Sequence, residues 1–264
     1  MKTIAGALII LASLSACVTG YAEKRDNTMT TRTVAVRDFN GIETSSGIKV
    51  VYSQGQLSPA KVSAPRYILD YLEIEVDEGT LELSINSRYW KSFNSINDDI
   101  TITVSSPAIN KLEASSGGSI KVNGKVMVKG NADIETGSGG SISIPGGFTA
   151  TGTTEIETSS GSSISITGLT TPRIEADLSS GSQIDIINAS ATYSEFDLSS
   201  GSSCNVSGTT TTLKVDASSG SSFNGKKFLA KTADIDAASG AGVDYNAQKA
   251  NADAGMTGSA HNHR

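Results

Sequence analysis

Residues 156–168 read IETSSGSSISITG, and this stretch decides the fold because close variants of it recur along the chain. From Gly117 onward the triplet Ser-Ser-Gly, or a near variant, returns every 19 to 22 residues. A constant period of this length indicates a repeat architecture, in which each unit buries its apolar face only against its neighbours. The triplet ends at Gly47, Gly117, Gly139, Gly161, Gly181, Gly201, Gly220 and Gly240.

Apolar residues keep a constant distance from this glycine. The third residue after it is apolar in every repeat, and the fifth is apolar in every repeat except at Gly225. Spacing by two is typical of a strand with one buried face. A second glycine or asparagine seven places on predicts another corner with positive φ. The residues three places after the glycine are Val50, Ile120, Ile142, Ile164, Ile184, Cys204, Phe223 and Val243.

Each repeat therefore predicts a strand, a Ser-Ser-Gly corner, a second strand, another corner and a shorter third segment. A propeller blade needs about 40 residues, twice this period. A parallel β-helix needs one coil of this length and rises about 4.8 Å per coil. We predict an all-β fold: a single-stranded right-handed parallel β-helix, with an N-terminal β part that carries inserted hairpins. The hand follows from the crossover rule.

The first residues resemble an export signal. Residues 1–16 contain Lys2 and then an apolar run that is too short to span a bilayer but long enough for a secretory signal peptide. Small residues precede Cys17, as in a bacterial lipobox, so we expect lipidation at Cys17. Ordinary cleavage near Ala16 is the alternative.

Four further segments follow. Residues 17–32 show no period and predict a flexible tether. Residues 33–110 alternate in several short runs and predict an N-terminal β region, with a hairpin turn at Glu78-Gly79. Residues 111–246 hold the repeats of about 20 residues. Residues 247–264 are polar and small, and we expect a C-terminal tail that frays.

Composition excludes several classes of protein. The charged share of 18% and the 27 glycines do not suit an all-helical chain. The net charge of −6 argues against nucleic acid as a partner. The two histidines stand at 261 and 263, in the last four residues, so we expect no imidazole chemistry, no catalytic residues and no enzyme.

The sharpest pattern is an acidic column four places before each glycine. Because the residue next to it points inward, the acidic side chain points outward. Neighbouring charges about 4.8 Å apart repel by about 0.8 kcal/mol in water. One interpretation is a solvated face that discourages association. Another is a calcium-responsive ladder, since carboxylates are ligands of hard cations; otherwise we expect no metal and no cofactor. The column comprises Glu43, Glu113, Glu135, Glu157, Asp177, Asp197, Asp216 and Asp236.

Two other features are candidates for contact. Tyr89, Trp90 and Phe93 lie close together between two predicted strands. Exposed aromatics are natural contacts for sugars or proteins, but these three side chains could equally plug the end of the stack. The Ser-Ser-Gly hydroxyls could satisfy the corners or form a strip that recognises glycans.

The motif FNGI at residues 39–42, followed by GIKV at residues 47–50 and the Ser/Gly repeats, resembles the putative auto-transporter adhesin, head GIN domain family. That family occurs largely in Bacteroidetes. The resemblance covers roughly residues 34–245 and makes residues 33–110 the head GIN region. It implies a parallel β-helix and a surface or adhesive role, with no established catalytic residues.

We therefore expect a non-catalytic cell-envelope lipoprotein, held in the outer membrane by its lipid and either periplasmic or surface-exposed. It would present a repetitive Ser/Gly and acidic surface to a cell-surface glycan or protein. Two alternatives stay open: a polysaccharide-active enzyme of the β-helix type, and a purely structural envelope scaffold. Basic residues, which a polysaccharide lyase needs, are sparse along the repeats.

Overall fold

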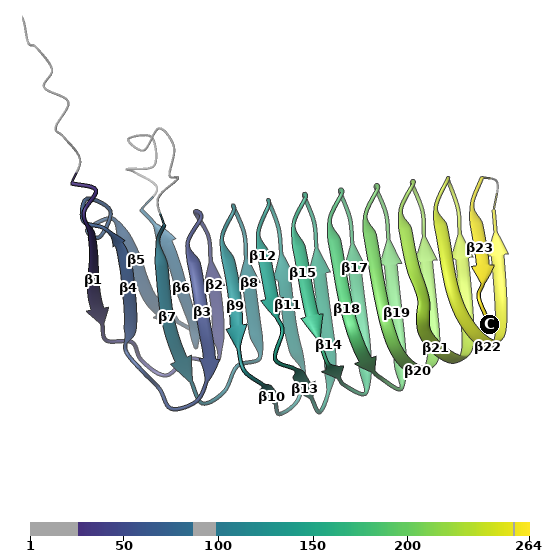
Figure 1. Ribbon diagram of the computed structural model, residues 1–264, viewed down its shortest axis with the longest axis horizontal. Coiled ribbons are helices and arrows are strands. Elements are labelled where there is room, and N and C mark those ends of the chain that lie inside the picture. Colours follow the sequence, from purple (N-terminus) through teal and green to yellow (C-terminus); the bar gives the residue numbers. More distant parts are fainter. Residues whose placement is uncertain (1–25, 87–98, 256) are drawn as a thin grey trace, which may run out of the picture.

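The computed structural model describes residues 26–86, 99–255 and 257–264. Over these residues all regular secondary structure is strand. The strands wind into a solenoid of coils stacked along one long axis (Figure 1). None of the described residues forms a helix that could cross a membrane. The predicted parallel β-helix is confirmed.

One coil has two long faces and one short face. In the coil of residues 132–150, β11 (Ala132–Thr136) leads to the Ser-Gly turn, β12 (Ser141–Ile144) returns from it, and β13 (Phe148–Ala150) closes the coil. Each strand pairs in parallel with its equivalent in the next coil, so that Ile134 lies opposite Ile156 and Ile142 opposite Ile164. One repeat therefore makes one coil.

We number the faces in the order in which the chain visits them. The first face contains β5 (Leu72–Asp77), β6 (Thr80–Ile85), β2 (Gly41–Thr44), β8 (Lys111–Ala114), β11, β14 (Thr153–Thr158), β17 (Arg173–Leu178), β19 (Tyr193–Leu198) and the later parts of β20 (Ser203–Ala217), β21 (Ser222–Ala237) and β22 (Gly242–Ala254).

The second face lies in front of the first in Figure 1. It contains β1 (Met29–Val34), β4 (Ala60–Pro65), β7 (Thr101–Ser106), β3 (Lys49–Gln54), β9 (Ser119–Asn123), β12, β15 (Ser163–Thr167), β18 (Gln183–Ser190), the first parts of β20 to β22, and β23 (Ser259–Asn262). The third, short face contains β10 (Val126–Val128), β13, β16 (Leu169–Thr170) and the middle parts of the later strands.

The N-terminal end of the stack is closed by antiparallel strands. The coil of β2 and β3 lies between the repeats and β6 and β7, which pair with it in parallel on its other side. Beyond these, β5 forms the hairpin with β6 around Glu78-Gly79, and β4 and β1 extend the second face. Reversed edge strands end the parallel stack and limit pairing with another chain.

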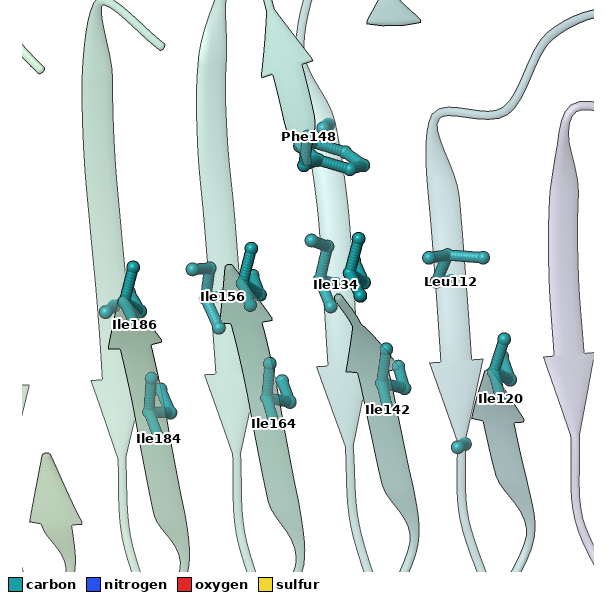
Figure 2. Close-up of a cluster of buried hydrophobic side chains, with 14 of the residues drawn as sticks. Leu112, Ile120, Ile134, Ile142, Phe148, Ile156, Ile164, Ile184 and Ile186 are labelled. Carbon is teal, nitrogen blue, oxygen red and sulfur yellow. The ribbon is translucent and has the colours of Figure 1, made fainter. Parts of the chain in front are cut away.

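Aliphatic rows fill the interior. Figure 2 shows isoleucines of the second face lying against Leu112, Ile134 and Ile156 of the first. Cys204 continues the isoleucine row with no exposed surface, and burial raises the pKa of its thiol, so it fills the core as an apolar residue does. The isoleucine row consists of Ile120, Ile142, Ile164 and Ile184, each at most 2% exposed.

Tight turns connect the first face to the second. In the turn after β14, Ser160 and Gly161 have φ of 54° and 69°, and the Ser162 amide donates to the Ser159 carbonyl at 3.2 Å. Positive φ at both central residues is a type I′ turn, for which glycine is suited. The Gly161 amide donates to the Ser180 carbonyl of the next coil at 3.1 Å, so the turns stack as the strands do.

The serine that follows the turn glycine ties successive coils together. The Ser162 hydroxyl is buried and donates to the Thr136 carbonyl of the previous coil at 2.9 Å. Ser182, Ser202 and Ser221 repeat this bond at 3.1 to 3.2 Å. The hydroxyl that satisfies the corner thus comes from the residue after the Ser-Ser-Gly triplet.

Two segments expected to lack regular structure form strands. Residues 29–32 of the predicted tether belong to β1, which pairs with β4. Residues 247–264, expected to fray, continue β22 to Ala254 and form β23, which together make a further coil. Their backbone groups pair with the coil below, and this pairing overrides a composition in which Met256 is the one large apolar residue.

Candidate binding groove

The in-register stacking joins the acidic column into one row on the first face, which we call the carboxylate row. All eight predicted acidic residues lie in it, each directly opposite the next. The structure adds Glu75 and Glu82 at the N-terminal end and Asp253 at the other. The order along the stack is Glu75, Glu82, Glu43, Glu113, Glu135, Glu157, Asp177, Asp197, Asp216, Asp236 and Asp253.

A groove of about 750 Å³ follows the carboxylate row where the first face meets the turns. One wall consists of the row from Glu113 to Asp236, which covers six steps between coils and hence about 29 Å. The other wall consists of the residues two places before the turn glycine. These are mostly serines: Ser115, Ser159, Ser179, Ser199 and Ser218.

In the described part of the chain, ion pairs offset the charge of the row at two positions, Glu113 and Asp216, which flank its middle. Lys111 pairs with Glu113 at 3.0 Å, and Lys214 pairs with Asp216 at 2.9 Å. Glu135, Glu157, Asp177 and Asp197 take part in no ion pair among the described residues. We call these four the central carboxylates. Their unpaired charge makes the middle of the groove attractive to cationic groups.

A second outward column on the same face is better balanced. Arg173 pairs with Glu175 and, at 3.0 Å, with Glu195, and its guanidinium lies 4.1 Å from the centre of the Tyr193 ring. Lys214 also reaches Glu195, at 2.8 Å. Arg173 binds Glu175 and Glu195 of this column, and Lys214 binds Glu195 and also Asp216 of the carboxylate row. Neither cation pairs with a central carboxylate.

Several carboxylates of the row have a raised pKa. Burial, together with the neighbouring Asp177 and Asp216, raises the pKa of Asp197 to about 6. Burial and adjacent carboxylates also raise the pKa of Glu43, Glu157 and Asp177. Burial is the larger cause of these raised pKa values, and repulsion between neighbouring carboxylates adds to it.

We expect the protein to become more stable as the pH falls from 7.5 to 5. A carboxyl with a raised pKa in the folded state binds a proton more readily folded than unfolded. Its stabilising contribution is therefore complete below its unfolded pKa and is lost as the pH rises through the folded value, about 6 for Asp197. The thermal midpoint, followed by circular dichroism at constant ionic strength, measures the effect.

The control is Asp197→Asn, which should flatten this dependence. A hydrogen bond from Lys49 lowers the pKa of Asp99, so protonation of Asp99 destabilises the folded protein. This protonation occurs below pH 5 and therefore does not affect the comparison. A midpoint that falls between pH 7.5 and pH 5, or a slope unchanged by Asp197→Asn, would contradict the electrostatic account.

The second face carries polar groups of another kind. Its outward positions hold Ser141, Ser163 and Ser203, followed by an amide ladder. In that ladder Asn224 donates to Asn205 at 3.2 Å, and Asn205 donates to Asp185 at 2.8 Å. The serines of the second face are therefore separate from the groove, whereas the first serines of the Ser-Ser-Gly triplets line the groove beside the carboxylate row.

Tyr89, Trp90 and Phe93, and the lipidation site Cys17, lie outside the described residues. Within the described residues, no three His, Cys, Asp or Glu side chains are grouped so as to hold a metal ion, and the calcium interpretation gains no coordination site.

Known structures share this fold. A putative lipid binding protein from Parabacteroides distasonis ATCC 8503 is 15% identical, with a TM-score of 0.78 over 90% of this chain and 96% of that one. A putative adhesin from the same organism is 15% identical, with a TM-score of 0.78 over 90% and 98%. A putative adhesin from Bacteroides fragilis NCTC 9343 is 18% identical, with a TM-score of 0.63 over 90% and 98%.

These similarities show that the solenoid fold is shared. A sequence identity of 15 to 18% shows nothing beyond the fold. No curated protein sequence matches the chain. The model of one family, however, matches residues 38–146 and again residues 148–263, which is nearly everything that the solenoid contains. The double match places both the capped N-terminal half and the stacked coils in that family. The chain belongs to the putative auto-transporter adhesin, head GIN domain family.

Proposed function

We propose that this chain is a non-catalytic lipoprotein of the cell envelope that binds a cell-surface protein or glycan along its groove. The observation that carries the proposal is the carboxylate row, which lines one wall of a groove of about 750 Å³. A groove about 29 Å long accommodates an extended polymer. Its serine wall offers hydroxyls for hydrogen bonds, and its acidic wall attracts cations.

The charge of the groove favours one class of partner. The central carboxylates lack ion-pair partners among the described residues, so a bound cationic group would relieve their repulsion. An extended protein segment rich in lysine or arginine supplies such groups at intervals. A neutral glycan would meet only the serine hydroxyls, and we therefore place a basic protein segment ahead of it.

The envelope location rests on the family and on the first residues. Relatives in fold are described as putative adhesins, which suits a protein displayed at a cell boundary. The apolar run before Cys17 suits export, and lipidation of Cys17 would hold the solenoid at the outer membrane. Membership of an adhesin family agrees with this arrangement.

The groove does not resemble an active site. Polysaccharide hydrolysis needs two carboxyl groups with different roles at a defined separation. Along the row the same group recurs at each coil. The described groove lining also contains no histidine and no cysteine. A repeated, equivalent row suits avidity toward a polymer better than turnover.

Neutralising the central carboxylates tests the proposal. The variant combines Glu135→Gln, Glu157→Gln, Asp177→Asn and Asp197→Asn and keeps the shape of each side chain. We expect it to bind immobilised poly-lysine at least thirty-fold more weakly than the unaltered chain, because four exposed ion pairs contribute about 0.5 kcal/mol each. Biolayer interferometry at two salt concentrations provides the measurement, alongside panels of glycans and envelope proteins.

The control variant removes four carboxylates that do not line the groove: Glu155→Gln, Glu175→Gln, Asp185→Asn and Asp234→Asn. It has the same net charge as the groove variant. We expect it to keep most of the binding. Equal losses in the two variants would show attraction to overall charge and would contradict a role for the groove.

A further inference from the structure

Of the two halves of β22 in the last coil, one is covered by a further strand and the other is not. Among the described residues, no strand lies beyond the second half of β22, and the inward row of this half consists of exposed alanines at 250, 252 and 254. The first half of β22 carries larger inward residues, Val243 and Tyr245, which are 1% and 5% exposed. Residues 259–264 cover this half, and we call them the end strap.

The end strap is attached mainly by polar contacts. Its strand β23 pairs with Gly242 to Tyr245. The Asn262 amide then binds both backbone groups of Ala247 at 3.1 Å, which imitates one more pair of ladder bonds. Beyond it, the His263 ring hydrogen-bonds to Asp244 at 2.6 Å, and Arg264 donates to the Gln248 carbonyl at 3.0 Å.

Little apolar surface secures these contacts. Ala260 is the one apolar residue of the strap, and it is only partly buried. Segments with few buried apolar contacts open locally at low free-energy cost. The strap therefore detaches more easily than any inner coil, and its detachment exposes Val243, Tyr245 and an open strand edge.

The turn before the strap contains a residue with a strained backbone, Thr257. It closes through the bond from the Gly258 amide to the Gly255 carbonyl at 3.0 Å, like the Ser-Ser-Gly turns. However, Thr257 stands where those turns have glycine, and its φ is 74°. A β-branched residue in this region is a conformational outlier. The strap thus follows a strained threonine at the position that glycine holds in the Ser-Ser-Gly turns.

We propose that the end strap is exchanged between two copies of this chain, which gives a dimer joined at the last coils. A short hinge under strain favours such exchange. In the dimer each β22 edge receives the partner's strap with the same ladder, amide and histidine contacts, so these contacts are kept. The small alanines on the second half of β22 let the two last coils approach closely.

The strap that binds the open edge of β22 comes from a second copy of this chain, because the side chains along this edge match those of the strap. Asp244 faces His263 on one side and Lys226 on the other, at 3.2 Å from the lysine nitrogen. Ala247 presents both backbone groups at the spacing of the Asn262 amide. An unrelated strand would make the ladder bonds but not these side-chain contacts.

A disulfide trap tests the exchange. Gly242 and Ser259 lie opposite each other in the ladder, so the full chain carrying Gly242→Cys and Ser259→Cys is oxidised after equilibration over a wide range of concentrations. Exchange predicts a covalent dimer on a non-reducing gel whose share rises with concentration. Sedimentation of the unaltered chain should show a dimer over the same range.

Two controls decide the outcome. The single variants Gly242→Cys and Ser259→Cys should give no comparable covalent dimer. Thr257→Gly relieves the strained turn and should lower the dimer share several-fold. Covalent monomer alone at every concentration, with an unaltered chain that sediments as a monomer, would overturn the proposal. A dimer that forms equally well from the single variants would overturn it too.

Discussion

Replacing Phe196 by alanine is expected to lower the free energy of unfolding by about 3–5 kcal/mol. Phe196 has no exposed surface and lies in a cluster of three buried phenylalanine rings. Its ring centre is 5.1 Å from that of Phe223 and 6.3 Å from that of Phe228, the latter edge-on. Removing the ring leaves a cavity that three coils share, and rigid strand pairing prevents its collapse.

Urea unfolding followed by circular dichroism measures this loss. A solenoid is stabilised by contacts between neighbouring coils, so hydrogen exchange should quicken first around β19 to β21. The control is Met127→Ala, at a side chain that is 64% exposed, where we expect a change within about 0.5 kcal/mol. Equal effects of the two substitutions would contradict the described core.

Replacing Gly208 by alanine is expected to cost about 2–6 kcal/mol. Gly208 has φ of 126°, and a Cβ there would lie 2.0 Å from the Ala189 carbonyl oxygen of the previous coil. The atoms in the way belong to the backbone, so the two coils must separate or the turn must change. Either response breaks ladder bonds on the third face.

Gly161→Ala is the matched control for this substitution. Its φ is 69°, but no atom lies within 4 Å of the position of a Cβ. It should therefore carry only the cost of the left-handed backbone, about 1–2 kcal/mol. Comparing the two midpoints in urea separates crowding from backbone conformation. A larger loss at Gly161 than at Gly208 would refute the close approach of the coils.

Much of the fold could be predicted from the sequence because each repeat defines its coil through short-range spacing alone. A glycine every 19 to 22 residues, with apolar residues three and five places on, defines a coil without knowledge of its neighbours. The position of β6 beyond β2 depends on pairing between distant segments, which no local pattern reveals. The last coil was missed because Gly255 to Gly258 lacks the Ser-Ser-Gly triplet and because alanines fill its inward row.

The carboxylate row was partly predictable for the same reason. Eight members follow from their spacing to the glycine. Glu82 and Asp253 had a weaker signal in the runs Leu81-Glu82-Leu83 and Ala252-Asp253-Ala254, which match the alternation around Glu135 and Asp236. The groove itself was not predictable, because it depends on how the turns and the first face meet in space.

The central claim is that equivalent turns are stacked one strand spacing apart, which creates both the row and the groove. Nitroxide labels on the exposed turn residues Ser138, Ser219 and Ser239 test it by electron double resonance. The account predicts separations of about 19 Å for Ser138 with Ser219 and about 24 Å for Ser138 with Ser239, four and five coils apart. Separations that do not grow with the number of intervening coils would contradict it.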